Sequence, residues 1–544
     1  MRSAAPLEDA CLLKRLSNTA ITDAVDRPVN LAFAERISVR FGATLLANVA
    51  RSGLSFLTSV IIARSLGASQ YGNLNFLLGS FAAFTFLLDM GSTPAFFTFI
   101  SQRRRTPLFF ALYIAWTVGI QFVLTMLVLR FLVPDSVLAA IWVNQPRRLV
   151  LLACAASFLM TQAWLTVTQM GEATRKTILV QAAGVLQGFV HLMLVVMLVR
   201  TGLLNIASIL WLLIVEFSLF SILVGPRLLR GNIANDGAST PSWKEIVREF
   251  GVYCAPLIIY GWVNCLYAFG NRWLLQEFGG SVQQGFFSVG QQFSVIGLIA
   301  ATSILNVFWK EIAEAREHGD GERVRVLYRR AWRGLYCFAG SVTCFLIPYS
   351  RDILSIALGQ EFATGWLTLA IMLLLPIHQS IGQLLGAFFY ATAETRRYTK
   401  IGLASMLVTM PATYVMLAPP TARIPGLGLG SIGLALTMVT VQMAVINIQS
   451  RWLARVHGWN HEYGFQFAVI VLFLALGVFS RWSALQLFRI VGHPAVSMVA
   501  IALMGGVIYW AGVAFVVIRI PYLEVDREFS ARVMRGLGFL KPAS

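Results

Sequence analysis

The segment IIARSLGASQYGNLNFLLGSF, from Ile61 to Phe81, ends one long apolar run, turns through a short polar stretch and begins a second apolar run. The same alternation recurs along the chain and gives about fourteen apolar runs, each close to the roughly 20 residues that a helix needs to cross a bilayer. With a mean hydropathy of +0.71 and only 12% charged residues, the chain is predicted to be an all-α polytopic membrane protein.

Arginine and lysine crowd into every second connection between the apolar runs. The even-numbered connections hold 21 of these residues, whereas the odd-numbered connections and their flanks hold 10. Because basic loops stay on the cytoplasmic side of a membrane, the even-numbered connections and both termini are predicted to be cytoplasmic. This orientation signal accounts for the net charge of +18. The sequence contains no basic soluble module of the kind that would indicate a nucleic-acid partner.

Two segments of the chain resemble each other and predict an internal repeat. Residues 63–76, ARSLGASQYGNLNF, and residues 271–290, NRWLLQEFGGSVQQGFFSVG, each place an arginine and a turn before a glycine-aromatic helix start. We therefore expect two six-helix lobes related as parallel repeats, followed by two appended helices. The predicted divisions are an N-terminal cytoplasmic segment with an interfacial helix at 1–40, the first lobe at 41–228, a cytoplasmic linker at 229–249, the second lobe at 250–450, the appended helices at 465–518 and a cytoplasmic tail at 519–544.

Two polar stretches predict structure outside the bilayer core. Residues 31–41 are expected to form a short amphipathic helix at the membrane interface. The longest polar connection, from Lys310 to Arg333, carries charges at helical spacing on both sides of Gly319 and Gly321. We expect it to form a solvated helical hairpin.

The segment from Ile61 to Ser101 closely resembles the opening of bacterial polysaccharide flippases of the Wzx type. These flippases belong to the multidrug/oligosaccharidyl-lipid/polysaccharide exporter (MOP) superfamily. The most specific part runs from Arg64 through Leu66-Gly67 and Tyr71-Gly72 to Asp89. Three further segments match the family: QMGEATRK at 169–176, GFFSVG at 285–290 and FFYATAETRRYTK at 388–400.

This resemblance implies a V-shaped transporter with MATE-like lobes and no catalytic site, cofactor or metal. It would move an undecaprenyl-diphosphate-linked oligosaccharide from the cytoplasmic to the periplasmic leaflet of the bacterial inner membrane, for lipopolysaccharide or exopolysaccharide synthesis. Membrane lipids are implied contacts, and a polysaccharide polymerase and export machinery are candidate partners. The chain departs from the family at Asn271, where relatives commonly have an acidic residue before the arginine, so a coupling role of that acid is not expected here.

Moving a diphosphate and a sugar across hydrocarbon requires a polar path within the spans. Arg51 lies near the middle of the first predicted span and is expected to bind the diphosphate, since a guanidinium can donate two hydrogen bonds at once. The alternative is a structural arginine that bonds to carbonyls or to Glu216. Arg272 is a second candidate, although an arginine at the end of a span often reaches only to the interface. The remaining substrate-binding candidates are Asn264, Gln379 and Gln383.

Three interior groups could take up a proton, and two acidic residues could act at a gate. Glu216, His191 and His378 are the coupling candidates, because histidine titrates near pH 6.5, and ordinary interhelical hydrogen bonds are the alternative for each histidine. Asp89 and Glu172 are the gate candidates. We expect Asp89 to pair with the basic residues at 103–105 and Glu172 to pair with those at 175–176, with static helix caps as the alternative.

Other functions remain open from the sequence. A multidrug exporter and a lipid II exporter share the same fold, but the cationic first span of a lipid II flippase is matched only by Arg51 and Arg64. A membrane-embedded glycan polymerase or ligase is the alternative from another class, although such an enzyme should carry a large periplasmic loop. The chain contains no GxxxxGK[ST] motif, which argues against a primary ATPase.

Overall fold

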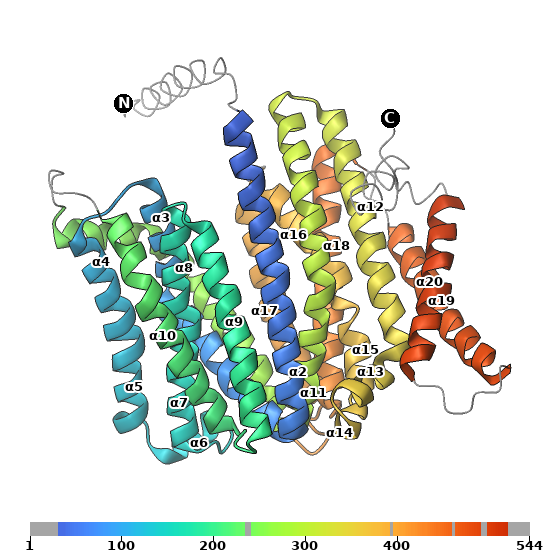
Figure 1. Cartoon of the computed structure of the whole chain (residues 1–544), viewed down its shortest axis with the longest axis horizontal. Coiled ribbons are helices and arrows are strands. Elements are labelled where there is room, and N and C mark those ends of the chain that lie inside the picture. The colour runs from blue at the N-terminus through green and yellow to red at the C-terminus, as the bar shows by residue number, and fades with distance from the viewer. Residues whose placement is uncertain (1–30, 234–240, 392–394, 460–462, 491–497, 520–544) are drawn as a thin grey trace, which may run out of the picture.

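The computed structural model describes residues 31–233, 241–391, 395–459, 463–490 and 498–519. The described chain is almost entirely helical and contains only one isolated β-bridge, so the all-α prediction is confirmed. Figure 1 shows two helical lobes side by side. The first lobe consists of α2 (Leu31–Asp89), α3 (Ser92–Gln102), α4 (Pro107–Ile114), η1 (Ala115–Leu124), α5 (Thr125–Leu127), η2 (Val128–Leu132), α6 (Asp135–Ile141), α7 (Arg147–Phe158), η3 (Leu159–Ala163), α8 (Trp164–Ala173), α9 (Thr177–Arg200) and α10 (Ile206–Asn232).

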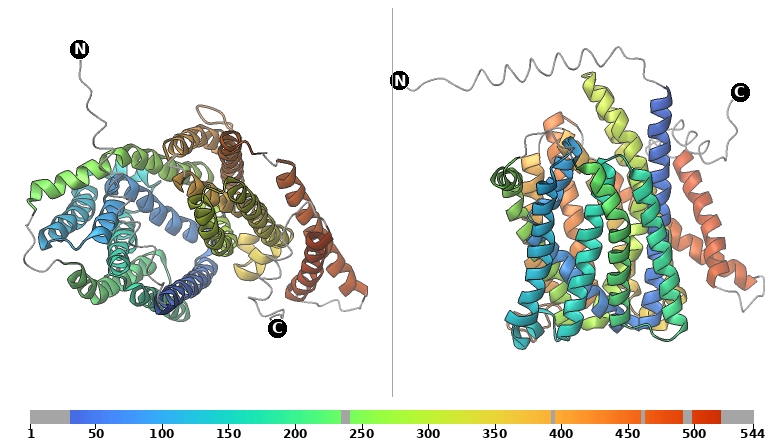
Figure 2. Two further views of the ribbon diagram at one scale, coloured as in Figure 1. Left: turned by 90° about the horizontal axis from the view of Figure 1, so that it is seen from above. Right: turned by 60° about the vertical axis from the view of Figure 1, so that its left-hand side comes forward.

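The second lobe begins with α11 and carries the appended helices on its outer flank (Figures 1 and 2). The appended pair packs on α12, where the Tyr509 hydroxyl donates to the Ser341 carbonyl at 2.8 Å. The elements of this half are α11 (Trp243–Glu317), α12 (Gly321–Leu346), η4 (Ile347–Tyr349), α13 (Ser350–Ala357), α14 (Gln360–Ala363), α15 (Trp366–Met372), α16 (Leu375–Ala391), α17 (Thr395–Leu417), α18 (Gly430–His457), α19 (Tyr463–Ile490) and α20 (Met498–Arg519).

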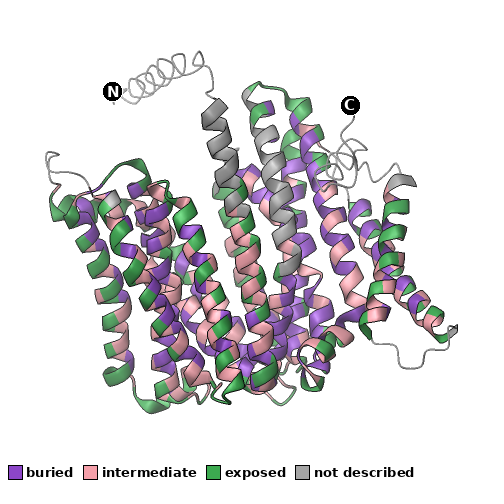
Figure 3. Cartoon of the chain, viewed as in Figure 1, coloured by how far each residue is buried: buried purple, intermediate pink, exposed green. Residues whose placement is uncertain are grey.

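The surface of the described helices fits a lipid environment. Eleven stretches are long and apolar enough to cross a membrane, and two of them contain a kink that divides them into two limbs, which agrees with about fourteen crossings. Large apolar side chains such as Ile222, Phe467 and Val507 are about 70% exposed. Figure 3 shows exposed residues on the outward faces of the helices and buried residues between them. Such wide apolar exposure is rare on soluble proteins, so the chain is a multi-pass membrane protein.

The internal repeat is visible in the backbone as two matching kinks. Gly67 in α2 has φ 76° and ψ 170°, and Gly280 in α11 has φ 76° and ψ 178°. Only glycine adopts this region readily, because it has no Cβ. A second glycine follows each kink after five residues, at Gly72 and Gly285. The weak sequence similarity therefore corresponds to a true structural repeat, and we call the end of the molecule that holds both kinks the kink side.

The two lobes meet at these glycines in a reciprocal contact. A Cβ on Gly72 would overlap the carbonyl oxygen of Ser281, and a Cβ on Gly285 would overlap the carbonyl oxygen of Ala68. The hydroxyl oxygens of Ser69 and Ser281 lie 2.7 Å apart in the same contact. The missing side chains thus let the two backbones touch.

Two charged residues strengthen the contact on the kink side. The carboxylate of Glu361 in α14 accepts a hydrogen bond of 3.0 Å from the amide of Ala68, the first residue after the kink. Arg64 Nη1 donates to the carbonyl of Ile356 at 2.9 Å. Both bonds join the first lobe to the second, so the lobes are firmly closed against each other here.

The opposite end of the molecule, where α10 ends and α11 begins, is called the linker side below. One expectation near this end is wrong, and a second, the charged hairpin, is confirmed except at its last residue. Residues 31–40 continue α2 without a break and do not form a separate interfacial helix. The charged hairpin does turn at Gly319, but Arg333 is only 1% exposed, with its guanidinium 5.0 Å from the ring centre of Phe465. That arginine is part of the packed second lobe and not of a solvated surface.

Candidate functional site

A cavity of about 590 Å³ lies against the first lobe. Side chains from α2, η3, α8, α9 and α10 line it, and Gln292 and Val295 of α11 complete the wall from the second lobe. Tyr71 lines it just beyond the kink and bonds through its hydroxyl to Ser59 Oγ at 2.7 Å. The polar lining residues in the spans include Arg51, Ser52, Ser55, Thr58, Ser59, Asn75, Gln187, His191 and Gln292.

Arg51 lines this cavity and has no acidic partner in the part of the chain that the structure describes. Its Nη2 donates to Asn48 Oδ1 at 2.8 Å. Its Nη1 lies beside Gly184 of α9, where an added Cβ would be 3.4 Å away. The expected alternative partner, Glu216, bonds to His191 instead. Most of the guanidinium donors of Arg51 therefore remain available to a ligand.

The position of Arg51 along its helix is measured from the kink. α2 runs continuously from Leu31 to the kink at Gly67, and the segment from Arg51 to Gly67 spans about 24 Å at 1.5 Å per residue. The hydrocarbon core is about 30 Å thick. Arg51 therefore lies on the linker side of the kink, and its place near the middle of the span stays a prediction.

His191 and Glu216 form a pair at the wall of the same cavity. His191 Nδ1 lies 2.8 Å from Glu216 Oε2. His191 faces the cavity, whereas Glu216 is 2% exposed and its other oxygen, Oε1, is buried without a hydrogen-bond partner in the described structure. The third coupling candidate, His378, is 2% exposed in the second lobe beside the ring of Tyr336. The structure thus brings two of the three candidates together.

A second cavity, of about 980 Å³, lies in the second lobe. It is enclosed by the first limb of α11 and by α16, α17 and α18. The predicted residues Gln379 and Gln383 line it. Sequence reasoning missed Gln442 and Gln449, which could have been found from their seven-residue spacing on one face of an apolar helix. It also missed Arg396 and Lys400 as lining residues and treated them only as loop charges.

Arg272 and Asn264 lie outside both cavities. Arg272 packs against Gly79, and a Cβ added to this glycine would lie 2.6 Å from the guanidinium of Arg272. The Nη2 atom of Arg272 donates a hydrogen bond to Gln291 Oε1 at 3.2 Å. It fills the interface between α2 and α11 and neither extends to the membrane surface nor joins Arg51. Asn264 is half-buried on α11 and lines neither cavity.

The two gate candidates do not form the expected ion pairs. Asp89 Oδ1 accepts hydrogen bonds from Ser92 Oγ at 2.7 Å and from Thr93 Oγ1 at 2.6 Å. It also accepts one from Gln162 Nε2 at 3.2 Å, so Asp89 caps the start of α3 and does not pair with residues 103–105. Glu172 is exposed and has no ion-pair partner among the described residues. The hydroxyl groups of Ser92 and Thr93 supply hydrogen bonds to the Asp89 carboxylate from nearby in the chain, which favours the static helix cap.

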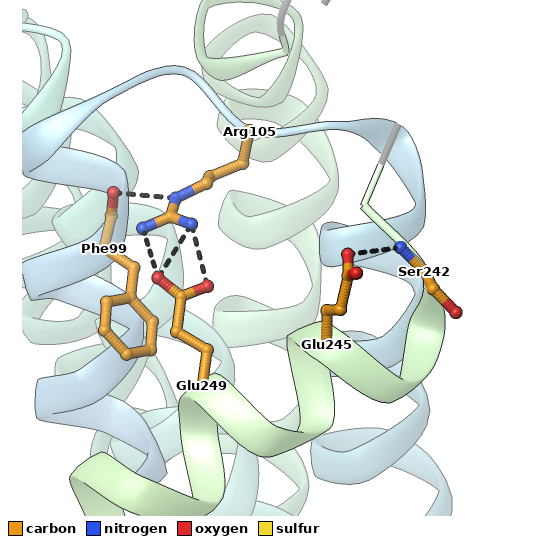
Figure 4. Close-up of polar contacts among 5 residues, drawn as sticks. All are labelled: Phe99, Arg105, Ser242, Glu245 and Glu249. Carbon is orange, nitrogen blue, oxygen red and sulfur yellow. Dashed lines mark hydrogen bonds and ion pairs between the residues drawn. The ribbon is translucent and has the colours of Figure 1, made fainter. Parts of the chain in front are cut away.

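The arginine triplet at 103–105 contains a buried residue with a separate role. Arg103 and Arg104 are exposed, but Arg105 is 6% exposed. Its Nη1 and Nη2 donate to the carboxylate of Glu249 in α11 at 2.9–3.0 Å, and its Nε donates to the Phe99 carbonyl at 3.0 Å (Figure 4). The pair fastens the first turns of α11 to the first lobe on the linker side.

The fold and the cavities define a class: a two-lobed helical membrane protein with a polar cavity in each lobe. Residues 40–309, about half of the chain, match the family model described as "Polysaccharide biosynthesis protein". This part of the chain belongs to that family, and the resemblance seen in the sequence is confirmed. No curated protein matches the sequence.

Several solved structures share the fold. The "Lipid II flippase MurJ, inward closed conformation" aligns with a TM-score of 0.65 and 12% identity, over 91% of this chain and 99% of that chain. The "Inward-facing conformation of a multidrug resistance MATE family transporter of the MOP superfamily" aligns with a TM-score of 0.57 and 13% identity, over 75% of this chain and 95% of that chain. A MOP superfamily transporter from Pyrococcus furiosus aligns with a TM-score of 0.51 and 12% identity, over 77% of this chain and 95% of that chain. These likenesses confirm the predicted MATE-like architecture.

Replacing Glu249 with glutamine should destabilise the protein. The change leaves Arg105 buried without its counter-ion, at a cost of roughly 2 kcal/mol, below that of a fully buried pair because Glu249 is 33% exposed. The measurement is the thermal unfolding midpoint of the purified protein in detergent. Glu245→Gln is the matched control, since Glu245 has no partner among the described residues except the Ser242 amide (Figure 4). Equal midpoints for the two variants would contradict the assigned role of Arg105.

Proposed function

We propose that the chain is a flippase for an undecaprenyl-diphosphate-linked oligosaccharide. The observation that carries the proposal is Arg51, a guanidinium without an acidic partner in the described structure, in a cavity between two lobes that are closed on the kink side. A guanidinium matches the geometry of a phosphate because it can donate two parallel hydrogen bonds. The match to the polysaccharide biosynthesis family supports a lipid-linked glycan as the cargo.

The direction of transport in this proposal follows from the distribution of basic residues. The excess of arginine and lysine in the even-numbered connections supports a cytoplasmic location, in a bacterial cell, for the linker side and both termini. Arg51 then lines the cavity on the cytoplasmic side of the kink-side contact, where the diphosphate headgroup would enter. The kink-side contact becomes the outer gate, which must separate for release to the periplasmic leaflet.

Two alternative cargoes use the same fold, and one alternative function is enzymatic. A drug or lipid II could occupy the same cavity, as the names of the similar solved structures suggest for those proteins. The family match favours a polysaccharide intermediate over both. A glycan polymerase or ligase is less well supported, because the described lining residues of the first-lobe cavity are suited to binding a headgroup and include no acidic side chain.

We further propose that the pair of His191 and Glu216 couples transport to the proton gradient. The histidine faces the cavity, and the buried carboxylate behind it would hold a proton or stabilise a protonated ring. Arg51 lines the same cavity, so a charge on His191 would change the local field at the diphosphate. Proton uptake and substrate binding would thereby depend on each other.

Replacing Arg51 with alanine should abolish export of the surface glycan while the protein remains at normal abundance. Arg51→Lys should restore export poorly, because an ammonium lacks the planar pair of donors. The measurement is surface glycan in cells that carry only the variant, normalised to membrane-inserted protein. Arg200→Ala, which removes an exposed arginine at the end of α9, is the control and should export normally. Full export by Arg51→Ala would remove this residue from the mechanism.

Replacing Glu216 with glutamine should remove the response of transport to an imposed proton gradient. The amide keeps the shape of the carboxylate but cannot exchange its charge with His191. Transport in proteoliposomes is measured with and without the gradient. His378→Gln tests the other coupling candidate and should leave the response intact. If Glu216→Gln responds to the gradient as the unmodified protein does, the coupling proposal is wrong.

A further inference from the structure

The second-lobe cavity carries an unusual set of primary amides. Gln379 and Gln383 lie one turn apart on α16, and Gln442 and Gln449 lie two turns apart on α18. These spacings place each pair on a single helix face. The two faces meet across the cavity, so four amides converge on one space within the helical bundle.

Within the described residues, these amides have no protein partner. None of the four side chains makes a hydrogen bond to another residue within the described ranges, whereas buried polar groups are normally paired. Gln449 is 4% exposed, and the Oε1 atom of Gln383 is buried without a partner. A buried amide without a partner loses its hydrogen bonds to water and gains none in return. The arrangement is therefore explained if an external ligand supplies the missing hydrogen bonds.

Glycines on α16 hold the amide set in place. An added Cβ at Gly382 would lie 2.8 Å from Ile446 Cδ1, and one at Gly386 would lie 3.1 Å from the hydroxyl of Tyr398. The absence of these side chains lets α17 and α18 approach α16 closely. Close packing on both sides fixes the helices, so the amides project from rigid elements into the space.

The chemistry of this lining suits sugar hydroxyls. A primary amide both donates and accepts hydrogen bonds, as does a hydroxyl group. Two tyrosines, Tyr260 and Tyr398, add flat apolar faces with polar tips. The volume of about 980 Å³ is at the upper end of the range for small-molecule sites. None of the described lining residues is acidic, and Arg396 and Lys400 also line the cavity, so acidic sugars are accommodated as well as neutral ones.

We propose that this second-lobe cavity binds the glycan of the lipid-linked substrate while Arg51 at the first-lobe cavity binds the diphosphate. The inference rests on the proposed flippase function and divides its substrate between the two lobes. The lobes would then hold opposite ends of one headgroup. Recognition of the sugar resides in α16 and α18, and recognition of the diphosphate, which all such substrates share, resides in α2.

Binding of two probes to the purified full-length chain tests this division. The first probe is the lipid-linked oligosaccharide extracted from cells that depend on the chain for export. The second is farnesyl diphosphate, which carries a prenyl diphosphate and no sugar. Gln379→Leu combined with Gln449→Leu should weaken oligosaccharide binding about tenfold or more, as expected for two lost hydrogen bonds. Binding of farnesyl diphosphate should not change.

Controls separate a loss of the site from a loss of the fold. Gln102→Leu, at an exposed position at the end of α3, applies the same substitution elsewhere and should leave both affinities unchanged. The single change Gln442→Leu, at a half-buried position, repeats the test with less disturbance of the core. Thermal unfolding midpoints show whether each variant is folded.

The outcomes distinguish this inference from the function on which it rests. Unchanged oligosaccharide binding by the folded glutamine variants would overturn the glycan site. An equal loss of both probes would also overturn it and would indicate that the cavity binds the diphosphate through Arg396 and Lys400. Retention of farnesyl diphosphate by Arg51→Ala would overturn the diphosphate site alone. If the unmodified chain binds neither probe, the proposed function and this inference are both wrong.

Discussion

The architecture depends on one backbone contact, in which Gly72 and Gly285 each press against a carbonyl of the opposite lobe. A side chain at either position would force the lobes apart on the kink side. The positive φ angles of Gly67 and Gly280 direct the two kinked helices into this contact. Four glycines therefore mark the pseudo-symmetry of the molecule at the closed end, and the cavities lie in the space that this end leaves between and within the lobes.

Within that space the two lobes differ in chemistry although they share a fold. The first-lobe cavity carries a cation and a histidine whose carboxylate partner is buried behind it. The second-lobe cavity carries amides, two tyrosines and two basic residues. Burying an isolated charge within a membrane costs more free energy than burying an amide. Both kinds of group are nevertheless present in the spans of this chain, which otherwise contain few polar residues. This asymmetry is what a substrate with a charged diphosphate at one end and a glycan at the other would require.

The sequence predicted the fold well because hydropathy, charge bias and glycine placement report directly on membrane crossings and on the repeat. It also named Arg51, Gln379, His191 and Glu216, since polar residues stand out within apolar spans. The sequence could not predict which charged residues form pairs, because pairing depends on which side chains become buried. Arg105 resembles Arg103 and Arg104 in sequence, but of the three only Arg105 is buried against α11. Asp89 was assigned to distant arginines when adjacent hydroxyl groups satisfy it.

The central claim is that the kink-side contact is a gate that opens during transport. The double variant Ser69→Cys and Ser281→Cys tests it directly by forming a disulfide cross-link, because the two hydroxyl oxygens are 2.7 Å apart in the closed state. Five native cysteines within the described residues are free, so the unmodified protein and each single variant serve as controls under the same oxidant. Transport in proteoliposomes should stop when the pair is oxidised and should return on reduction. Transport at the unmodified rate with the cross-link fully formed would contradict the account.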